Sequence, residues 1–292
     1  MKTLKTLTIL VILSILQIQN LSAQFIHEFS VDGGIGLSST LRYQLSSGNR
    51  SGSMGGDFGV GYTFFSAKER VTGTERVFRE LWGIHTGIGV GMYNAKSNLD
   101  GVKNEIKGLS DGDLVYDMFD LRTTLNRYNE TQKTMFLNIP VMALFQIEQI
   151  YIMGGLKFGI PVNGKYSSKD ATLTNKAYYH DLENEIDAPA FRGLGKFDNM
   201  NYNGDLELGL AVMLALEAGY KWHIADNLSV YTGLYFDCGL NNTAKGDKNQ
   251  PFVNYNPQNQ PENFSTNSAL SSFTDKAKPM AVGIRLRFAM EK

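Results

Sequence analysis

The segment LELGLAVMLALEAGY, residues 206–220, decides the fold class because its apolar residues occupy every second position. The even positions from Leu206 to Tyr220 are apolar, whereas the odd positions hold mostly small residues and the charges Glu207 and Glu217. A strict period of two is typical of a β-strand. Strands of soluble sheets usually have about 5–6 residues, and a strand tilted across a bilayer needs about 9–11. The length of this segment therefore favours a membrane-crossing strand.

The closing segment, Met280–Phe288, repeats the pattern and indicates which face meets lipid. Its apolar positions alternate with positions that include Arg285 and Arg287. A charged side chain that faces lipid at mid-depth costs about 2–4 kcal/mol. We therefore expect Glu207, Glu217 and both arginines to face the interior.

Six more segments alternate in the same way and bring the count to eight, an even number as closed bacterial barrels require. They cover residues 29–37, 57–64, 82–92, 135–146, 150–162 and 228–240. Glycines crowd the inner face, which fits a narrow barrel. Pro140 cannot donate to a strand ladder, so we expect a bulge in the fourth strand. The prediction is all-β: an eight-stranded antiparallel transmembrane β-barrel with long external loops, one of which carries a short helix.

The N-terminus has the order of a secretory signal. Lys2 and Lys5 precede an apolar run over residues 7–18, and Ala23 follows as a small residue at a cleavage position. We expect residues 1–23 to be a cleaved signal peptide and residues 24–292 to form the outer-membrane barrel domain. An uncleaved anchor is the alternative, although the run is shorter than the roughly 20 residues of a spanning helix.

Aromatic residues occur where strands are expected to reach the periplasmic interface. We predict an interfacial belt, since tryptophan and tyrosine are enriched at that level, although aromatic residues also cap soluble sheets. Its members are Trp82, Phe145, Tyr151, Trp222 and Phe288.

The phrase FLNIPVM, residues 136–142, followed by GGLKFGIPV, residues 154–162, resembles the small outer-membrane β-barrel family that is related to PorT and to the OmpA barrel domain. Asn138 stands where that family usually has an acidic residue. The closing strand resembles the signal that the barrel-assembly machinery reads, on Gly283, Leu286 and Phe288, with Ala281 in place of the polar residue. The resemblance implies a structural or interaction role.

Composition excludes several classes of function. The formal net charge is −1, so no positive field favours nucleic acid. Cys238 is the single cysteine, and the sequence has no Cys/His cluster with metal-ligand spacing. We therefore expect no nucleic acid partner, no cofactor and no metal.

The charges on the inner face are candidates for an interior network, which we expect to fill a narrow lumen because buried charges need partners. A lining for a small-solute pore is the alternative. The candidates are Asp32, Asp57, His85, Lys157, Glu207, Glu217, Asp237, Arg285 and Arg287.

The histidines suggest a third hypothesis, that the protein is a membrane hydrolase. His85 is the one histidine expected inside the barrel, where satisfaction by a neighbouring carboxylate is the simpler interpretation. His180 and Asp181 lie in an external loop and are similar to the Asp/His pairs of outer-membrane proteases. Adjacent residues do not normally adopt catalytic geometry, so we expect no catalytic residue.

One external loop shows helical spacing after Ser110 and predicts a short helix that either packs on the barrel or docks a partner. Its apolar positions are Leu114, Met118, Leu121, Leu125 and Tyr128.

Together these patterns predict a non-catalytic anchor in the outer membrane of a Gram-negative bacterium that presents long loops at the cell surface. The expected partners are outer-membrane lipid, the barrel-assembly machinery during biogenesis, and a protein that contacts the external loops.

Overall fold

The computed structural model describes the chain except for residues 1–23, 73–75, 111–117, 246–250 and 256–263. The predicted signal peptide and Leu114 lie outside the described residues. Among the described residues, no helix is long and apolar enough to cross a bilayer.

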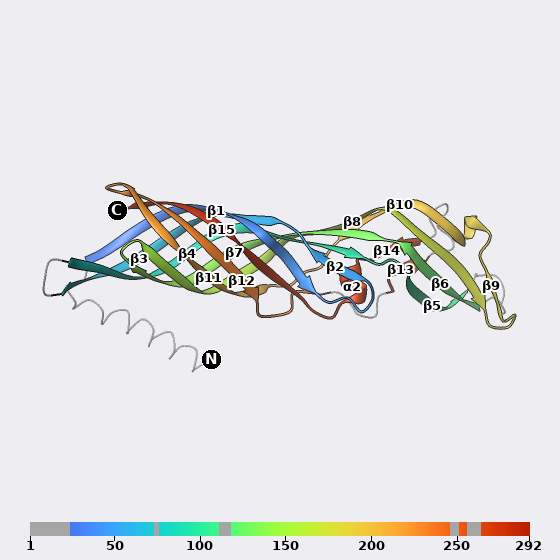
Figure 1. Cartoon of the computed structure of the whole chain (residues 1–292). Helices are drawn as coiled ribbons and strands as arrows, with labels where there is room; N and C mark the ends of the chain where they lie inside the picture. The colour runs from blue at the N-terminus through green and yellow to red at the C-terminus, as the bar shows by residue number, and fades with distance from the viewer. Residues whose placement is uncertain (1–23, 73–75, 111–117, 246–250, 256–263) are drawn as a thin grey trace, which may run out of the picture.

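Eight strands pair in chain order around a closed ring, and the last strand pairs with the first (Figure 1). All neighbours run antiparallel, which confirms the eight-stranded barrel. Closure leaves no strand edge unpaired, as hydrocarbon surroundings require. The strands are β1 (Gln24–Tyr43), β3 (Gly55–Thr72), β4 (Arg76–Asn98), β7 (Asn129–Ile147), β8 (Ile150–Tyr179), β11 (Ala211–Ala225), β12 (Leu228–Gly239) and β15 (Ala277–Glu291).

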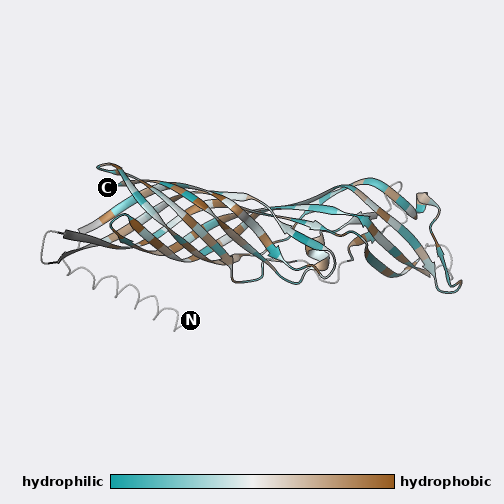
Figure 2. Cartoon of the chain, in the orientation of Figure 1, coloured by the Kyte–Doolittle hydropathy of each residue, from teal (hydrophilic) through white to brown (hydrophobic). Residues whose placement is uncertain are grey.

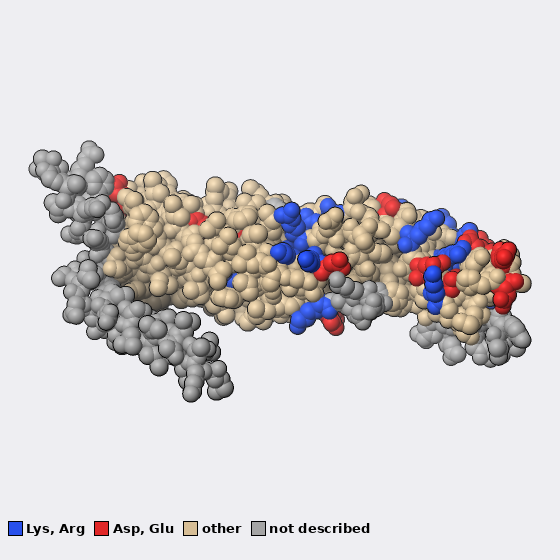
Figure 3. Space-filling view, turned by 90° about the horizontal axis from the view of Figure 1, so that it is seen from below, with Lys and Arg blue, Asp and Glu red and all other residues tan. Residues whose placement is uncertain are grey.

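The barrel wall is apolar outside and polar or small inside. In β11, Leu214 and Leu216 are exposed, whereas Met213, Ala215 and Glu217 are buried. Figure 2 shows apolar residues concentrated over the barrel, and Figure 3 shows a barrel surface with few charges on the side in view. The predicted inward and outward faces therefore hold along this strand.

Residues 206–210 do not continue β11, which corrects one end of the predicted strand. Leu206 and Leu208 are buried in a cluster with inward-facing strand residues such as Tyr93 and Met213, and Glu207 is exposed. The Leu206 amide donates to the Gly164 carbonyl, so this segment lies beyond the apolar wall. There, apolar side chains turn inward because the surroundings are water.

Pro140 interrupts the ladder without shifting it. Between β4 and β7, pairing stops after Thr86 with Val141 and resumes at Gly89 with Asn138 in the same register. The register shift occurs instead between β7 and β8, at Met135 and Phe136. The fourth strand is therefore irregular as predicted, but the bulge lies away from the proline.

The long external connections are mostly strands rather than irregular loops. At the end opposite Gln24 and Glu291, β8 continues beyond the barrel and further strands join it in an open sheet (Figure 1). We call this part the distal extension. It consists of β8 beyond residue 164 together with β5 (Val102–Ser110), β6 (Met118–Arg127), β9 (Asn184–Ile186) and β10 (Gly195–Asp205).

The helix predicted over residues 110–128 is wrong for its described part. Met118, Leu121 and Leu125 lie in β6, and Tyr128 lies between β6 and β7. A spacing of four residues satisfies a period of two as well as a helical one. β6 buries Phe119, Leu121 and Leu125 on one face, which is the pattern of a strand.

Short elements cover the distal extension and the barrel mouth. A helix does occupy an external connection, but it lies near the end of the chain, where Ser268 caps it by accepting from the Leu270 amide. Its buried residues and Phe252 pack on the inner face of the extension. These elements are β2 (Asn49–Gly52), η2 (Ala190–Arg192), β13 (Val253–Tyr255), β14 (Phe264–Thr266) and α2 (Ala269–Phe273).

Candidate functional site

The centre of the barrel is built around one carboxylate. Glu217 of β11 accepts hydrogen bonds from Arg285 Nη1 at 2.9 Å, Arg287 Nη2 at 3.0 Å and the Tyr151 hydroxyl at 2.8 Å. All four side chains are buried. A buried charge is tolerated when it is paired and hydrogen-bonded. Glu217 therefore joins three strands into one network.

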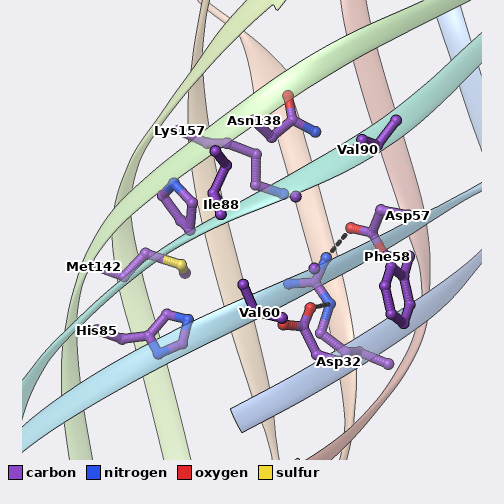
Figure 4. Close-up of a pocket in the computed structure, with 14 residues that line it drawn as sticks. Asp32, Asp57, Phe58, Val60, His85, Ile88, Val90, Asn138, Met142 and Lys157 are labelled. Carbon is purple, nitrogen blue, oxygen red and sulfur yellow. Dashed lines mark hydrogen bonds and ion pairs between the residues drawn. The ribbon is translucent and has the colours of Figure 1, made fainter. Parts of the chain in front are cut away.

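Two aspartates complete the cluster from the opposite wall. Arg285 pairs with Asp57 of β3, and its Nε atom lies 3.6 Å from Asp32 Oδ1. Figure 4 shows Asp32, Asp57 and Lys157 directed into a common space. A Cβ atom at Gly34 would overlap the Asp57 carboxylate, so this inner glycine makes room for the network.

A second pair lies beside this cluster. Lys157 Nζ is 2.5 Å from Asp237 Oδ2, and both side chains are buried. His85 has a different partner from the carboxylate expected, since its Nδ1 lies 2.9 Å from the Thr63 hydroxyl. A Cβ atom at Gly61 would lie 2.5 Å from the His85 ring, so the ring fills the space that glycine leaves. These contacts fix the positions of the Lys157 side chain and the His85 ring.

A further network near Gln24 and Glu291 was not predicted. Lys221 Nζ donates to Glu28 at 2.9 Å and to Glu291 at 2.7 Å, and Tyr231 also donates to Glu28. Lys221 follows Glu217 by four residues and Glu28 precedes Asp32 by four, so both continue the inner rows. Extending the period of two to the strand ends would have found them.

Two sequence predictions about this interior are corrected. Glu207 does not join the network, because it lies outside the wall and is exposed. Tyr151 is not part of an outer belt, because it is fully buried and bonds Glu217. Its position two residues before Met153 on the inner row explains its direction.

The other belt candidates lie on the outer surface. Trp82 and Phe145 contact each other with ring centroids 4.4 Å apart, and Trp222 contacts Tyr220 at 4.5 Å. Trp82, Trp222 and Phe288 are about half exposed, at 58%, 50% and 51%. These positions are compatible with an interfacial belt.

The residues of the predicted assembly signal lie on β15. Leu286 and Phe288 are exposed on its outward face, beside Gly283 on the inner row. Gly283 pairs with Gly36 of β1, where a Cβ atom would overlap the Ile35 carbonyl. Gly283 therefore permits close approach of the first and last strands.

In the described part of the chain, buried side chains occupy the lumen at the level of this cluster. The cavity beside Asp57 and His85 has a volume of about 30 Å³, which is the space of roughly one water molecule. Above it, Tyr93, Phe136 and Tyr235 belong to an apolar layer that also includes Leu270 of α2. Side chains and the α2 segment therefore fill the barrel from its centre to its distal mouth.

Glu130 connects the distal end of β7 to α2. Its carboxylate accepts from Ser268 Oγ at 2.5 Å, the Ala269 amide at 2.9 Å and Gln132 Nε2 at 2.7 Å. Burial raises the pKa of Glu130 above its ordinary value, against the effect of these donors. This carboxylate holds the covering segment on the wall.

His180 has its acidic partner on another strand. Its Nε2 lies 2.8 Å from Asp120 Oδ2 of β6, and the adjacent Asp181 is not that partner. A hydrogen bond from the Gly108 amide lowers the pKa of Asp120, and His180 adds to the effect. Among the described residues, no group of three or more His, Cys, Asp or Glu side chains is placed to hold a metal ion.

Comparison with solved structures gives distant similarities. Two solved structures are similar at low identity: a major outer membrane protein from Thermus thermophilus and a Pseudomonas aeruginosa FadL homologue. The first has 12% identity and a TM-score of 0.31, covering 91% of this chain and 99% of the other. The second has 8% identity and a TM-score of 0.15, covering 92% and 89%. No curated protein matches the sequence.

The family comparison covers more than half of the chain. Residues 71–245 match the model of the outer membrane protein beta-barrel domain. This match covers β4 to β12, including the whole distal extension and the strands that carry Lys157, Glu217 and Asp237. The chain therefore belongs to the outer membrane protein β-barrel domain family.

Proposed function

We propose that this outer membrane β-barrel protein is a non-conducting, non-catalytic anchor whose distal extension is an interaction surface outside the cell. The filled lumen is the observation that carries the proposal. Ion pairs around Glu217 are followed by an apolar layer, and the cavity beside Asp57 and His85 has a volume of about 30 Å³. A solute pore needs a continuous aqueous path, which such packing opposes.

The proposed orientation places Gln24 and Glu291 on the periplasmic side. Connections there are short at residues 148–149 and 226–227, whereas the connections at the other end are long, as in bacterial outer-membrane barrels. The proposal includes export by residues 1–23, cleavage after Ala23 in a Gram-negative cell, and insertion by the barrel-assembly machinery. N-terminal sequencing of the mature protein tests the cleavage position.

Conductance measurements test the anchor role. Full-length protein reconstituted in a planar lipid bilayer should give no steady current. A Tyr235→Ala/Arg285→Ala variant removes one side chain from the apolar layer and one from the charged cluster. It is the positive control, because an opened lumen should give a current. A steady current through the unmodified protein would contradict the anchor role and support the pore.

The tip of the distal extension offers the surface for a protein partner. Leu182, between β8 and β9, and Phe191, in η2, are 67% and 58% exposed on the distal extension. Exposed apolar groups outside a membrane can mark interaction sites. Each position can carry a photo-crosslinking residue in intact cells, with Lys165 as the exposed control position. Adducts at the tip but not at Lys165 would support the proposal, whereas equal labelling would contradict it.

A further inference from the structure

The outward face of β1 and β15 changes from apolar to cationic at the distal end of the barrel. On β15, the exposed residues Ile284 and Val282 are followed by Met280 and then by Lys278. Arg42 of β1 is the direct cross-strand partner of Lys278. Like charges directly opposite each other destabilise a sheet. The stability of the wall therefore does not explain why Arg42 and Lys278 lie opposite each other.

The two cations border a groove of about 680 Å³. Arg50 and Lys276 line the same groove, so four cations from three segments surround it. Figure 3 shows Lys and Arg side chains gathered where the uncharged barrel surface ends. The groove thus lies at the level where lipid tails give way to headgroups.

The residues that line the groove carry no negative side chain to offset its positive charge. Its lining residues include no Asp or Glu, and none of the four cations forms an ion pair within the part of the chain that the structure describes. Arg50 donates to Thr40 Oγ1 at 3.0 Å and to the Leu41 carbonyl at 2.9 Å. Burial lowers the pKa of Arg50, and the nearby charge of Arg42 lowers it further.

The groove also has an apolar side. Pro279 and Met280 line it, and the exposed side chains of Leu37, Leu240 and Val282 lie on the neighbouring wall. Guanidinium groups bind phosphate through paired hydrogen bonds, and lysine adds a point charge. A ligand with an anionic head and apolar chains matches both parts of this surface.

We propose that this groove binds the phosphate-bearing headgroup of a lipid of the outer leaflet, with the acyl chains lying along the apolar wall below Met280. The inference rests on the orientation given under Proposed function, but it does not depend on a closed lumen or on a protein partner. Arg42 and Lys278 hold the phosphate, while Arg50 and Lys276 add charge at the solvent side.

Lipid binding to the full-length protein in detergent micelles tests the site. Native mass spectrometry can compare lipid A, a phosphorylated glycolipid used as the probe, with zwitterionic phosphatidylcholine. We expect lipid A to bind at least about tenfold more tightly. An Arg42→Gln/Lys278→Gln variant should lose most of this preference. It should remain folded, because the substitution removes a like-charge pair.

The control variant Lys103→Gln/Lys169→Gln changes the net charge equally at exposed positions of the distal extension. It should bind lipid A as the unmodified protein does. Equal binding of both lipids by the unmodified protein, or an equal loss in the control variant, would overturn the site. Displacement of lipid A by an equal concentration of inorganic phosphate would assign the groove to a soluble anion and also overturn the proposal. None of these results alters the conductance measurement, so the two proposals fail independently.

Discussion

Strands of the barrel wall and of the distal extension both alternate with a period of two. The wall exposes its apolar row and buries its polar row, whereas the extension buries its apolar row. In the first half of β8, Ile152 and Ile160 face outward and Lys157 faces inward. In its second half, Leu173 and Ala177 are buried, whereas Lys176 on the alternate row has a side chain that is 43% exposed. The difference is visible as the change in colouring along the molecule in Figure 2.

The surrounding solvent, rather than the strand conformation, therefore determines which row of side chains is buried. Lipid solvates apolar groups, so the wall turns its charges inward and pairs them. Water solvates charges, so the extension buries its apolar row under α2 and Phe252. Substitutions on either side of this reversal should therefore differ strongly in their effect on stability.

Glu217→Gln should produce the largest loss of stability. The substitution leaves Arg285 and Arg287 without their shared carboxylate inside the wall, which typically costs about 3–5 kcal/mol. Urea-induced unfolding of the protein in lipid vesicles, followed by gel migration, measures it. Glu207→Gln is the matched control, because Glu207 is exposed and should change stability by less than about 0.5 kcal/mol. Similar losses in both variants would contradict the interior network.

Leu216→Arg should destabilise the membrane-inserted barrel by about 2–4 kcal/mol, because Leu216 is exposed on the lipid-facing row. Leu182→Arg should leave stability nearly unchanged, although Leu182 is more exposed and also apolar. Refolding yield into vesicles and urea midpoints provide the comparison. If Leu216→Arg and Leu182→Arg changed stability equally, the outer wall of the barrel and the tip of the distal extension would lie in the same solvent, and the comparison would be wrong.

Glu130→Gln should loosen the attachment of α2 by about 1–3 kcal/mol, because an amide cannot accept all the hydrogen bonds that reach this buried carboxylate. Hydrogen exchange of the α2 segment measures the change. Exchange in the strands of the barrel wall is the internal reference and should not change. Unchanged protection of α2 would show that Glu130 does not hold it.

The same carboxylate predicts a dependence on pH. Burial raises the pKa of Glu130 above 4.5, so the folded state favours the protonated form. Its contribution to stability is fully present below the ordinary pKa and is lost as the pH rises through the raised value. The difference in α2 protection between the unmodified protein and Glu130→Gln should therefore be largest at acidic pH. A difference that grows with pH would contradict this sign.

Arg122→Gln should have the smallest effect, although Arg122 pairs with both Glu105 and Glu185. These pairs lie on the solvent-facing side of the distal extension, where water and salt screen them. Thermal unfolding at low and high salt should differ little from that of the unmodified protein. A loss of stability comparable to that of Glu217→Gln would contradict the placement of Arg122 on a solvent-facing surface.

Much of the wall was predictable from residue order. Lipid leaves little freedom in assigning faces, so Glu217, Arg285 and Arg287 could be placed inside from their alternation with apolar residues. The inward and outward assignments were wrong at Leu206 and Glu207, because the period of two continues past the membrane. The assignment of Tyr151 was also wrong, because its aromatic side chain suggested the interfacial belt. Tyr151 is amphipathic and suits either an interface or a buried hydrogen bond.

Residue order alone specifies the eight membrane strands, their faces and the inward direction of most charges, because a bilayer penalises every misplaced charge and every unpaired backbone group. The three-dimensional fold was needed to decide that β5, β6 and β10 extend the wall, and that α2 covers it. It also decided that Arg42 meets Lys278 across two strands 236 positions apart in the sequence. In water, the spacing of Leu121 and Leu125 is compatible with a helix or a strand, and pairing with β8 selects the strand.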